Sequence, residues 1–246
     1  MKTGLIGAMR EEILLLKEDI QNLKTERLGS REFHSGTINK HELVMCLSGW
    51  GKVAAASTAT TLINHYQVDQ LVFIGLAGSV QPHLNIGDIV VANQLIQHDV
   101  DLSRLDGFPT VESPFWKTFE FDVFPDSGKN AIQAVDKFLL NLRKGDYPNI
   151  HPGYSPTVHV GAIGTGDQFI ASKEGKVRIN ERFPQVLCTE MEGAAIAQIG
   201  ADYQVPCTVI RVISDKADED AHDSFAKFLF EDISHISVEL AKLILS

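Results

Sequence analysis

The 246-residue sequence has few of the features that mark secreted, disulfide-bonded or membrane-bound proteins. Its only cysteines, Cys46, Cys188 and Cys207, lie far apart in apolar segments, so we expect reduced core thiols. No apolar run is long enough to cross a bilayer, and the one at the N-terminus is too short for a signal peptide. We therefore expect a cytoplasmic protein that makes no membrane contact.

Basic residues are also scarce. The sequence has 22 Lys and Arg residues against 32 Asp and Glu residues, its formal net charge is −10, and no basic tract exceeds two residues. Because an acidic surface repels a phosphate backbone, we do not expect nucleic acid as a partner. A small nucleoside, which need not carry phosphate, is compatible with this charge.

Apolar residues are abundant, at 44% of the chain, and form near-continuous runs. Such runs lack the alternation of a one-sided sheet and are typical of strands covered on both faces. Helical patterns at 11–23, 52–66 and 192–204 lie between them, and an amphipathic stripe extends from Phe225 to Leu243. The alternation favours a single α/β domain with largely parallel strands. The runs cover residues 3–9, 41–49, 70–78, 87–96, 158–166, 184–191 and 208–214.

Residues 102–156 depart from this alternation. They are rich in proline and in aromatic residues, and they contain one helical pattern at 129–142. Because disordered segments are poor in aromatic residues, we expect an atypical lid or subunit contact here, within a single domain that spans 1–246.

Glycines and carboxylates dominate the positions at which the apolar runs end. The stretch "TVIRVISDKADED" delivers Arg211, Ser214 and Asp215 to the end of one run, while Glu12 and Glu192 follow two others. In parallel α/β sheets, ligands bind beyond the carboxyl ends of the strands. The pattern therefore predicts a ligand site at that edge.

Each motif also has a purely structural explanation. Glu12 could stabilise the start of a helix through the helix dipole, and Thr189 with Glu192 could form a capping box. The segment "GTGDQF" could be a glycine turn, and "SDKADED" a solvated loop. The individual motifs leave these alternatives open.

Two further motifs suggest cofactors only weakly. "GWGKVA" fits a permissive dinucleotide pattern, but the acid that should end the next strand is missing, since Asp69 precedes that strand. "HDVD" (98–101) offers one histidine and two acids on an extended segment, which are more often solvated than metal-bound. We expect neither a metal nor an organic cofactor.

Taken together, eight segments resemble the methylthioadenosine/S-adenosylhomocysteine nucleosidases of the nucleoside phosphorylase/nucleosidase superfamily. The resemblance covers nearly the whole chain apart from 102–156. It implies a single α/β domain with a central mixed, barrel-like sheet flanked by helices, usually as a homodimer. It also implies hydrolysis of the N-glycosidic bond of a 5′-substituted adenosine without a cofactor. In chain order the segments are "GLIGAMREEI", "SGWGKVAAA", "GLAG", "GDIVVA", "HDVD", "GTGDQFI", "EMEGAAIA" and "RVISDKAD".

The resemblance assigns roles to individual residues. Asp215 corresponds to the general acid that protonates adenine N7, oriented by Ser214, and Glu12 to the residue that deprotonates the attacking water, with Arg211 nearby. Glu192 corresponds to the acceptor for the ribose hydroxyls. The remaining expected substrate contacts are Met191 on the sugar, Phe169 stacked on adenine, the Ile170 backbone at the adenine edge, Met9 and Phe225 around the ribose and 5′ group, and Trp50, Ala77 and Gly78.

The chemistry is consistent with these residue types. Adenine leaves poorly as an anion, so a buried aspartate with a raised pKa is needed to deliver a proton. Carboxylates such as Glu192 and Glu12 would stabilise the cationic sugar, and we expect Glu192 to stay ionised while Asp215 is protonated. Phosphate would meet repulsion from Glu11 and Glu12, which favours water as the nucleophile.

The sequence leaves the 5′ group open. Trp50 and Leu76 stand where the family usually has smaller or polar residues, and 102–156 replaces the segment that closes the 5′ pocket. A nucleosidase or phosphorylase for another purine nucleoside, or a non-catalytic nucleoside-binding protein on the same fold, remains the alternative.

Overall fold

The structure is a computed structural model that describes residues 1–246 except 102–118, 124, 152, 219–220, 222–232 and 246. Phe225, expected beside the ribose, lies outside the described residues. No helix within the described ranges is long and apolar enough to cross a membrane.

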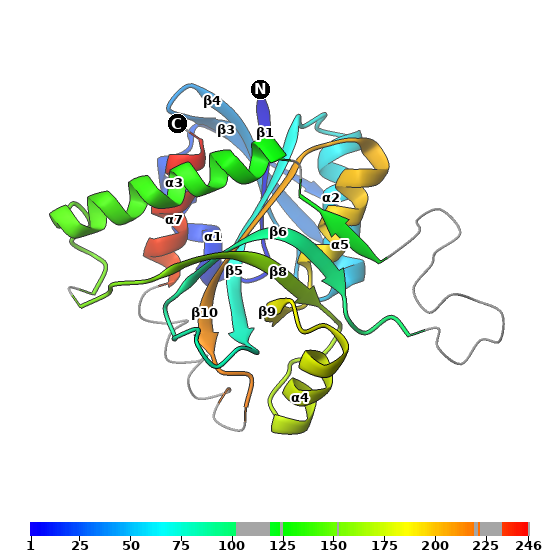
Figure 1. Cartoon of the computed structure of the whole chain (residues 1–246). Coiled ribbons are helices and arrows are strands. Elements are labelled where there is room, and N and C mark those ends of the chain that lie inside the picture. Colours follow the sequence, from blue (N-terminus) through cyan, green and yellow to red (C-terminus); the bar gives the residue numbers. More distant parts are fainter. Residues whose placement is uncertain (102–118, 124, 152, 219–220, 222–232, 246) are drawn as a thin grey trace.

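Five strands close into a mixed barrel, each pairing with two others (Figure 1). Parallel pairs join β10 to β5, β6 to β8 and β8 to β9, whereas β10–β6 and β5–β9 are antiparallel. This closed ring confirms the expected barrel-like sheet and the single α/β domain. Its strands are β5 (Gln70–Ser79), β6 (Ile89–Gln97), β8 (Val158–Thr165), β9 (Val186–Glu190) and β10 (Cys207–Asp215).

The sheet continues beyond the barrel through β1 (Lys2–Gly7), which pairs in parallel with both β5 and β4 (His41–Leu47). Two antiparallel strands follow, β3 (Arg31–Ile38) and β2 (Gln21–Leu28), and β7 (Glu120–Asp122) pairs with β6. All seven apolar runs form strands, as predicted. The pair β2 and β3 was not expected, because β2 is exposed along its length and has no apolar run.

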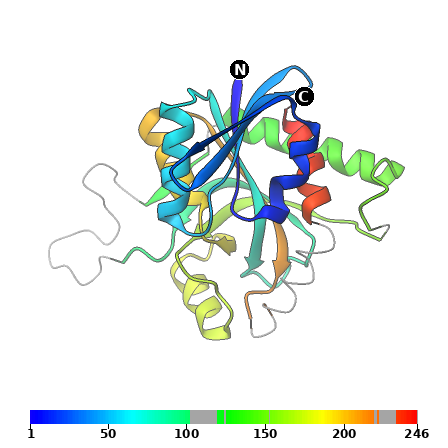
Figure 2. The ribbon, with the colours of Figure 1, turned by 180° about the vertical axis from the view of Figure 1, so that it is seen from behind.

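Helices cover the sheet on two sides (Figure 1). On one side α2 (Lys52–Asn64) packs against α5 (Gly193–Tyr203). On the other, α3 (Pro125–Lys144) and α1 (Arg10–Ile13) pack against α7 (Ile233–Ile244), which Figure 2 shows beside α1. The helix α4 (Lys173–Arg182) lies near the end of the barrel below β9 in Figure 1. Each side buries its own apolar cluster, so the sheet is covered on both faces.

The predicted helix over 11–23 is wrong in its extent. The helix α1 ends at Ile13, a 3₁₀ helix η1 (Leu14–Asp19) follows, and residues 21–23 belong to β2. Ile20 is extended and Asn22 has φ of 55°, a left-handed conformation that a helix cannot continue through. The buried side chains of Leu16 and Ile20 supply apolar anchors without a full helix.

The described part of 102–156 is packed against the rest of the domain. Here β7 adds to the edge of β6, and α3 contacts α7, β6 and β10. The lid or subunit contact expected for 102–156 stays a prediction, and residues 102–118, 124 and 152 of that segment lie outside the described residues.

Candidate active site

A cavity of about 430 Å³ lies at the carboxyl ends of the strands. It collects ten of the residues predicted for the site: Met9, Glu12, Trp50, Ala77, Gly78, Phe169, Met191, Glu192, Ser214 and Asp215. Its other lining residues, which the sequence did not single out as contacts, are Ala8, Leu76, Thr189 and Glu190. The sheet register explains the convergence, because Asp215 pairs with Gly78 and Gly78 pairs with Thr189.

The cavity has two distinguishable ends. At one end, Asp215 and Phe169 also line a small adjoining pocket of about 30 Å³, together with Ile170. Met9 and Trp50 line only the larger cavity. Both aromatic side chains are accessible, since Phe169 is half exposed and Trp50 is 71% exposed.

The carboxyl group of Asp215 is buried where β10 ends in a bulge. Its Oδ2 accepts a hydrogen bond from Ser214 Oγ at 2.8 Å, and its Oδ1 accepts one from the backbone N–H of Ala217 at 2.8 Å. Burial raises the pKa of Asp215, and the two hydrogen bonds oppose that rise. The group therefore holds a proton more readily than a solvated aspartate, as the role of general acid requires.

Glu12 is buried on the short helix α1. Its carboxylate accepts hydrogen bonds from the backbone N–H groups of Ala8 (2.6 Å), Met9 (2.9 Å) and Leu76 (3.2 Å). Burial raises its pKa, while the positive charge of Arg211 and these three donors lower it. The net shift of the Glu12 pKa is upward, so the donors fix the orientation of the carboxyl group and only partly oppose the effect of burial.

Glu192 precedes α5 and accepts a hydrogen bond from the Gly51 N–H at 2.7 Å. The capping box with Thr189 does not form, because the helix begins only at Gly193 and the side chain of Glu192 makes no cap bond. Burial and then the neighbouring Glu190 raise the pKa of Glu192 to about 8. This carboxyl group therefore holds a proton more readily than a solvated glutamate does, and its ionised state in the reaction stays a prediction.

Arg211 does not line the cavity but lies behind it, with 1% of its surface exposed. Its guanidinium forms an ion pair with Glu190 at 2.5 Å and stacks over the ring of Phe73 at 3.7 Å. The structure therefore places Arg211 as a charge partner of the buried carboxylates, and the residue does not line the cavity.

Glu190 was not predicted as a functional residue. Its carboxylate accepts hydrogen bonds from the Gly193 N–H (2.8 and 3.0 Å) and from Thr165 Oγ1, in addition to the Arg211 ion pair. The signal in the sequence was Arg211 itself, since a charge inside an apolar strand needs a buried partner.

The N-terminus of α2 is occupied by the chain's own acids. The Gly51 N–H donates to Glu192 and the Lys52 N–H to Asp167 (2.8 Å). Gly51 has φ of 90°, and a Cβ there would lie 3.0 Å from Asp167 Oδ1. In the "GWGKVA" motif, side-chain carboxylates thus bind the first N–H groups of the helix. The N–H groups of Gly51 and Lys52 are therefore not available to a dinucleotide phosphate.

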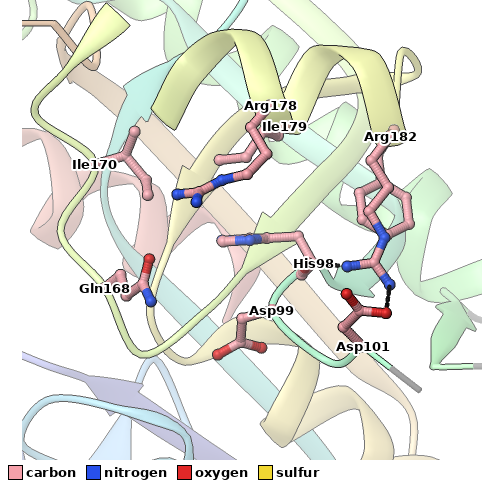
Figure 3. Close-up of a pocket in the computed structure, with 9 residues that line it drawn as sticks. His98, Asp99, Asp101, Gln168, Ile170, Arg178, Ile179 and Arg182 are labelled. Carbon is pink, nitrogen blue, oxygen red and sulfur yellow. Dashed lines mark hydrogen bonds and ion pairs between the residues drawn. The ribbon is translucent and has the colours of Figure 1, made fainter. Parts of the chain in front are cut away.

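A second pocket, of about 200 Å³, contains the "HDVD" segment (Figure 3). Arg182 pairs with Asp101 at 3.7 Å and donates to the carbonyl oxygen of Val100 at 2.7 Å, while Asp99 pairs with Lys52 at 2.6 Å. Burial lowers the pKa of His98, which favours its neutral form. The described residues contain no cluster with the composition of a metal site, and the acids of this segment are structural ion-pair partners.

Comparison with known proteins gives one consistent family. The profile of the phosphorylase superfamily matches residues 2–246. A 5′-methylthioadenosine/S-adenosylhomocysteine nucleosidase from Maridesulfovibrio salexigens is 37% identical over 240 residues, which cover 98% of this chain and 96% of that protein.

Solved structures agree with the sequence comparison. The nucleosidase of the same name from Neisseria meningitidis, in complex with methylthio-immucillin-A, superposes with a TM-score of 0.86 at 32% identity, covering 99% of this chain and 97% of that one. The futalosine hydrolase of Helicobacter pylori superposes with a TM-score of 0.83 at 33% identity, with 99% and 97% coverage.

Proposed function

The chain belongs to the 5′-methylthioadenosine/S-adenosylhomocysteine nucleosidases of the phosphorylase superfamily, and we propose that it hydrolyses the N-glycosidic bond of a 5′-substituted adenosine. It is an N-glycosyl hydrolase with nucleosidase activity on adenosine-type substrates. The finer assignment rests on one observation: Glu12, Glu192 and Asp215, which come from three distant parts of the chain, line a single cavity in three different environments.

Asp215 is the proposed general acid. It lies at the end of the cavity that Phe169 and Ile170 share, where an adenine ring would stack on Phe169 with its edge against the backbone of Ile170. The carboxyl group of Asp215, whose pKa is raised, would donate its proton to N7 of adenine as the N-glycosidic bond breaks. Positioned proton transfer of this kind typically accelerates a reaction about 10²–10⁴-fold.

Glu12 is the proposed base for the attacking water. Its carboxylate is held by three backbone N–H groups and faces the same cavity, so a water molecule beside it would be oriented toward the sugar. In its ionised form, Glu12 would stabilise the cation-like sugar without reorganisation, because the three donors hold its carboxylate in place.

Glu192 is the proposed contact for the ribose hydroxyls, with Met191 against the sugar face. When it is protonated, the carboxyl group of Glu192 donates a hydrogen bond as well as accepting one, and its raised pKa favours that form. The two glutamates, Glu12 and Glu192, thereby take different roles because different groups surround their carboxyl groups.

Hydrolysis is tested most simply in phosphate-free buffer. We expect 5′-methylthioadenosine to release free adenine and the free sugar with a hydroxyl group at C1. Strict dependence of adenine release on added phosphate would instead indicate a phosphorylase, and tight binding without any release would indicate a nucleoside-binding protein.

The identity of the 5′ group is not fixed by family membership. The similar solved structures include a 5′-methylthioadenosine/S-adenosylhomocysteine nucleosidase and a futalosine hydrolase, which have nearly equal sequence identity to this chain.

A further inference from the structure

The chain segment that follows Asp215 is hydrogen-bonded to the helix α4. Lys176 Nζ donates to the main-chain carbonyl oxygen of Lys216 at 2.8 Å. Lys216 lies between Asp215 and Ala217, and the Ala217 N–H is one of the two groups that bind the Asp215 carboxyl group. Residues 215–217, here called the acid turn, are thus held by a helix that does not line the cavity of the proposed active site.

The backbone of the acid turn has an unfavourable conformation. The register of β10 against β5 shifts between Ile213 and Asp215, and Ala217 has φ of 50°. This left-handed conformation is costly for a residue that carries a Cβ atom, and it persists only where surrounding groups hold it. The position of the Ala217 N–H, and with it that of the Asp215 carboxyl group, therefore depends on contacts from outside the turn.

Apolar packing and hydrogen bonds supply these outside contacts. Ala217 is buried in an apolar cluster that includes Ile179 of α4. Lys216 Nζ donates to the carbonyl oxygen of Leu84, while the carbonyl oxygen of Lys216 accepts the hydrogen bond from Lys176. The acid turn is therefore bound to α4 both by packing and through the side chain of Lys176.

The helix α4 is a well-supported base for Lys176. At its start, the side chain of Ser172 accepts a hydrogen bond from the Gly175 N–H at 3.1 Å. Closer to its end, Asn180 Nδ2 donates to the carbonyl oxygen of Val80 at 2.8 Å, which attaches α4 to the segment after β5. Lys176 lies between these two contacts, so its backbone is held in place.

Lys176 also brings a positive charge close enough to affect Asp215. Burial raises the pKa of Asp215 most and the charge of Asp218 raises it further, whereas the charge of Lys176 lowers it. A general acid must hold its proton before the reaction and release it during the reaction. The cation on α4 therefore limits an effect that would otherwise make the proton harder to release.

Several elements contribute titratable groups around Asp215. Lys176 in turn interacts with Asp215, Asp218 and Lys216, and burial lowers its own pKa. The titratable groups around Asp215 are Lys176 on α4, Lys216 and Asp218 in the segment after β10, Cys188 on β9, and the cavity-lining Glu12, Glu190 and Glu192.

We infer that Lys176 is a positioning residue for the general acid, because it holds the turn whose N–H binds the Asp215 carboxyl group and places a positive charge near that group. The inference rests on the proposed function, since it takes Asp215 as the acid. Lys176 does not line the cavity, so it would act through Asp215 and not through a contact with the substrate.

A purely structural role for Lys176 leads to a different expectation. If Lys176 only stabilised α4, its loss would lower the melting temperature and would change kcat by the same factor at every pH. A role through Asp215 also changes the pH at which the carboxyl group of Asp215 titrates. The titration of Asp215 therefore separates the two roles.

Lys176→Met removes the hydrogen bond and the charge but keeps an unbranched side chain. We expect the plateau value of kcat for adenine release from 5′-methylthioadenosine to fall about three- to tenfold, because a small displacement of a catalytic group is costly. KM should change by less than about twofold, since no substrate contact is removed.

The titration of Asp215 is measured directly by ¹³C NMR on protein labelled at the aspartate carboxyl carbons. The Asp215 signal is assigned by its loss in Asp215→Asn. In Lys176→Met the signal should titrate at higher pH than in wild type, because a charge that lowers the pKa of Asp215 has been removed.

Two further variants serve as controls. Lys176→Arg keeps the positive charge and a hydrogen-bond donor, so it should retain most of kcat and the wild-type titration of Asp215. Lys137→Met, which makes the same substitution at an exposed position on α3, should match wild type in both measurements. If Lys176→Met does not fold, Lys176→Gln, which also removes the charge, takes its place.

The outcomes distinguish this inference from the proposed function. If wild type releases adenine but Lys176→Met keeps either the wild-type kcat or the wild-type titration of Asp215, the nucleosidase stands and the inference is wrong. If wild type releases no adenine, the proposed function is wrong and the NMR titration decides whether Lys176 acts on Asp215. A titration that moves in Lys176→Met and returns in Lys176→Arg supports that action, and an equal titration in all three proteins overturns it.

Discussion

At the scale of single residues, three buried carboxyl groups acquire different properties from their immediate neighbours. Asp215 is held by one hydroxyl and one N–H, Glu12 by three N–H groups with Arg211 behind them, and Glu192 by one N–H beside a second acid. All three side chains end in a carboxyl group. Their different proposed roles therefore depend on how deeply each group is buried and on how many hydrogen-bond donors it contacts.

The pKa of Glu192 makes a prediction about stability. Below about pH 4.5 the carboxyl is protonated in both the folded and unfolded chain, whereas above about pH 8 the folded chain must hold a buried carboxylate. The folded state thus binds the extra proton between these values, and the free energy of unfolding falls as pH rises through them.

Glu192→Gln removes this titration. Relative to wild type, its free energy of unfolding should rise progressively between pH 5 and 9 and should exceed that of wild type by on the order of 1–3 kcal/mol at pH 9. Urea titrations at several pH values measure the difference. A difference that stays constant across this range would show that Glu192 titrates normally.

The ion pair of Arg211 and Glu190 makes a second prediction at this scale. Arg211→Met leaves a buried carboxylate without its partner and should lower the free energy of unfolding by about 3–5 kcal/mol. The double variant Arg211→Met/Glu190→Gln should recover part of that loss, because no buried charge is then unpaired. Denaturant unfolding of the two single variants and the double variant measures the coupling; additive losses would contradict it.

At the scale of elements, the ends of β5, β9 and β10 position the site because their backbones approach the carboxyl groups closely. A Cβ on Gly78 would lie 2.6 Å from Asp215 Oδ1, and one on Gly75 would lie 2.4 Å from Glu12 Oε1. Glycine is therefore needed at both positions of β5, because any side chain there would collide with the carboxyl group that faces it.

Gly78→Ala should displace the carboxyl group of Asp215 and lower kcat by at least tenfold, with little change in the melting temperature. The matched control is Gly128→Ala on α3, where the nearest atom to an added Cβ is 4.0 Å away. Adenine release and thermal unfolding of both variants test the prediction. Full activity of Gly78→Ala would mean that the position of Asp215 is not critical.

Elements with strong local signals could be predicted from the sequence. Every apolar run became a strand, and the periodic segments that became α2, α3 and α5 were identified. The hairpin of β2 and β3 was missed because it is stabilised by pairing with β4 and carries no apolar run in β2. The helix over 11–23 was overextended because its leucines fit a helix equally well, and only the left-handed turn at Asn22 shows otherwise.

At the scale of the whole molecule, the closed barrel depends on pairings between strands that are far apart in the sequence. Residue patterns alone favoured largely parallel strands, and the mixed barrel came from the resemblance to the family. The convergence of Glu12, Glu192 and Asp215 follows from strand-end positions.

The assembly is a prediction at this scale. The resemblance implies a homodimer, so we expect the protein to sediment at twice the mass of one chain at micromolar concentration. The aromatic-rich segment 102–156 is the expected contact. Replacing its residues 102–118 with a short Gly/Ser linker should shift the equilibrium toward monomer, whereas a wild-type protein that sediments as a monomer would contradict the prediction.

The account depends most on Asp215 acting as the acid that protonates the departing adenine. The most direct measurement is the rate of adenine release from 5′-methylthioadenosine by Asp215→Asn, compared with wild type in phosphate-free buffer at pH 7. We predict a kcat lower by about 10²–10⁴-fold with a folded protein of similar melting temperature. A folded Asp215→Asn variant that releases adenine at the wild-type rate would contradict the proposed mechanism.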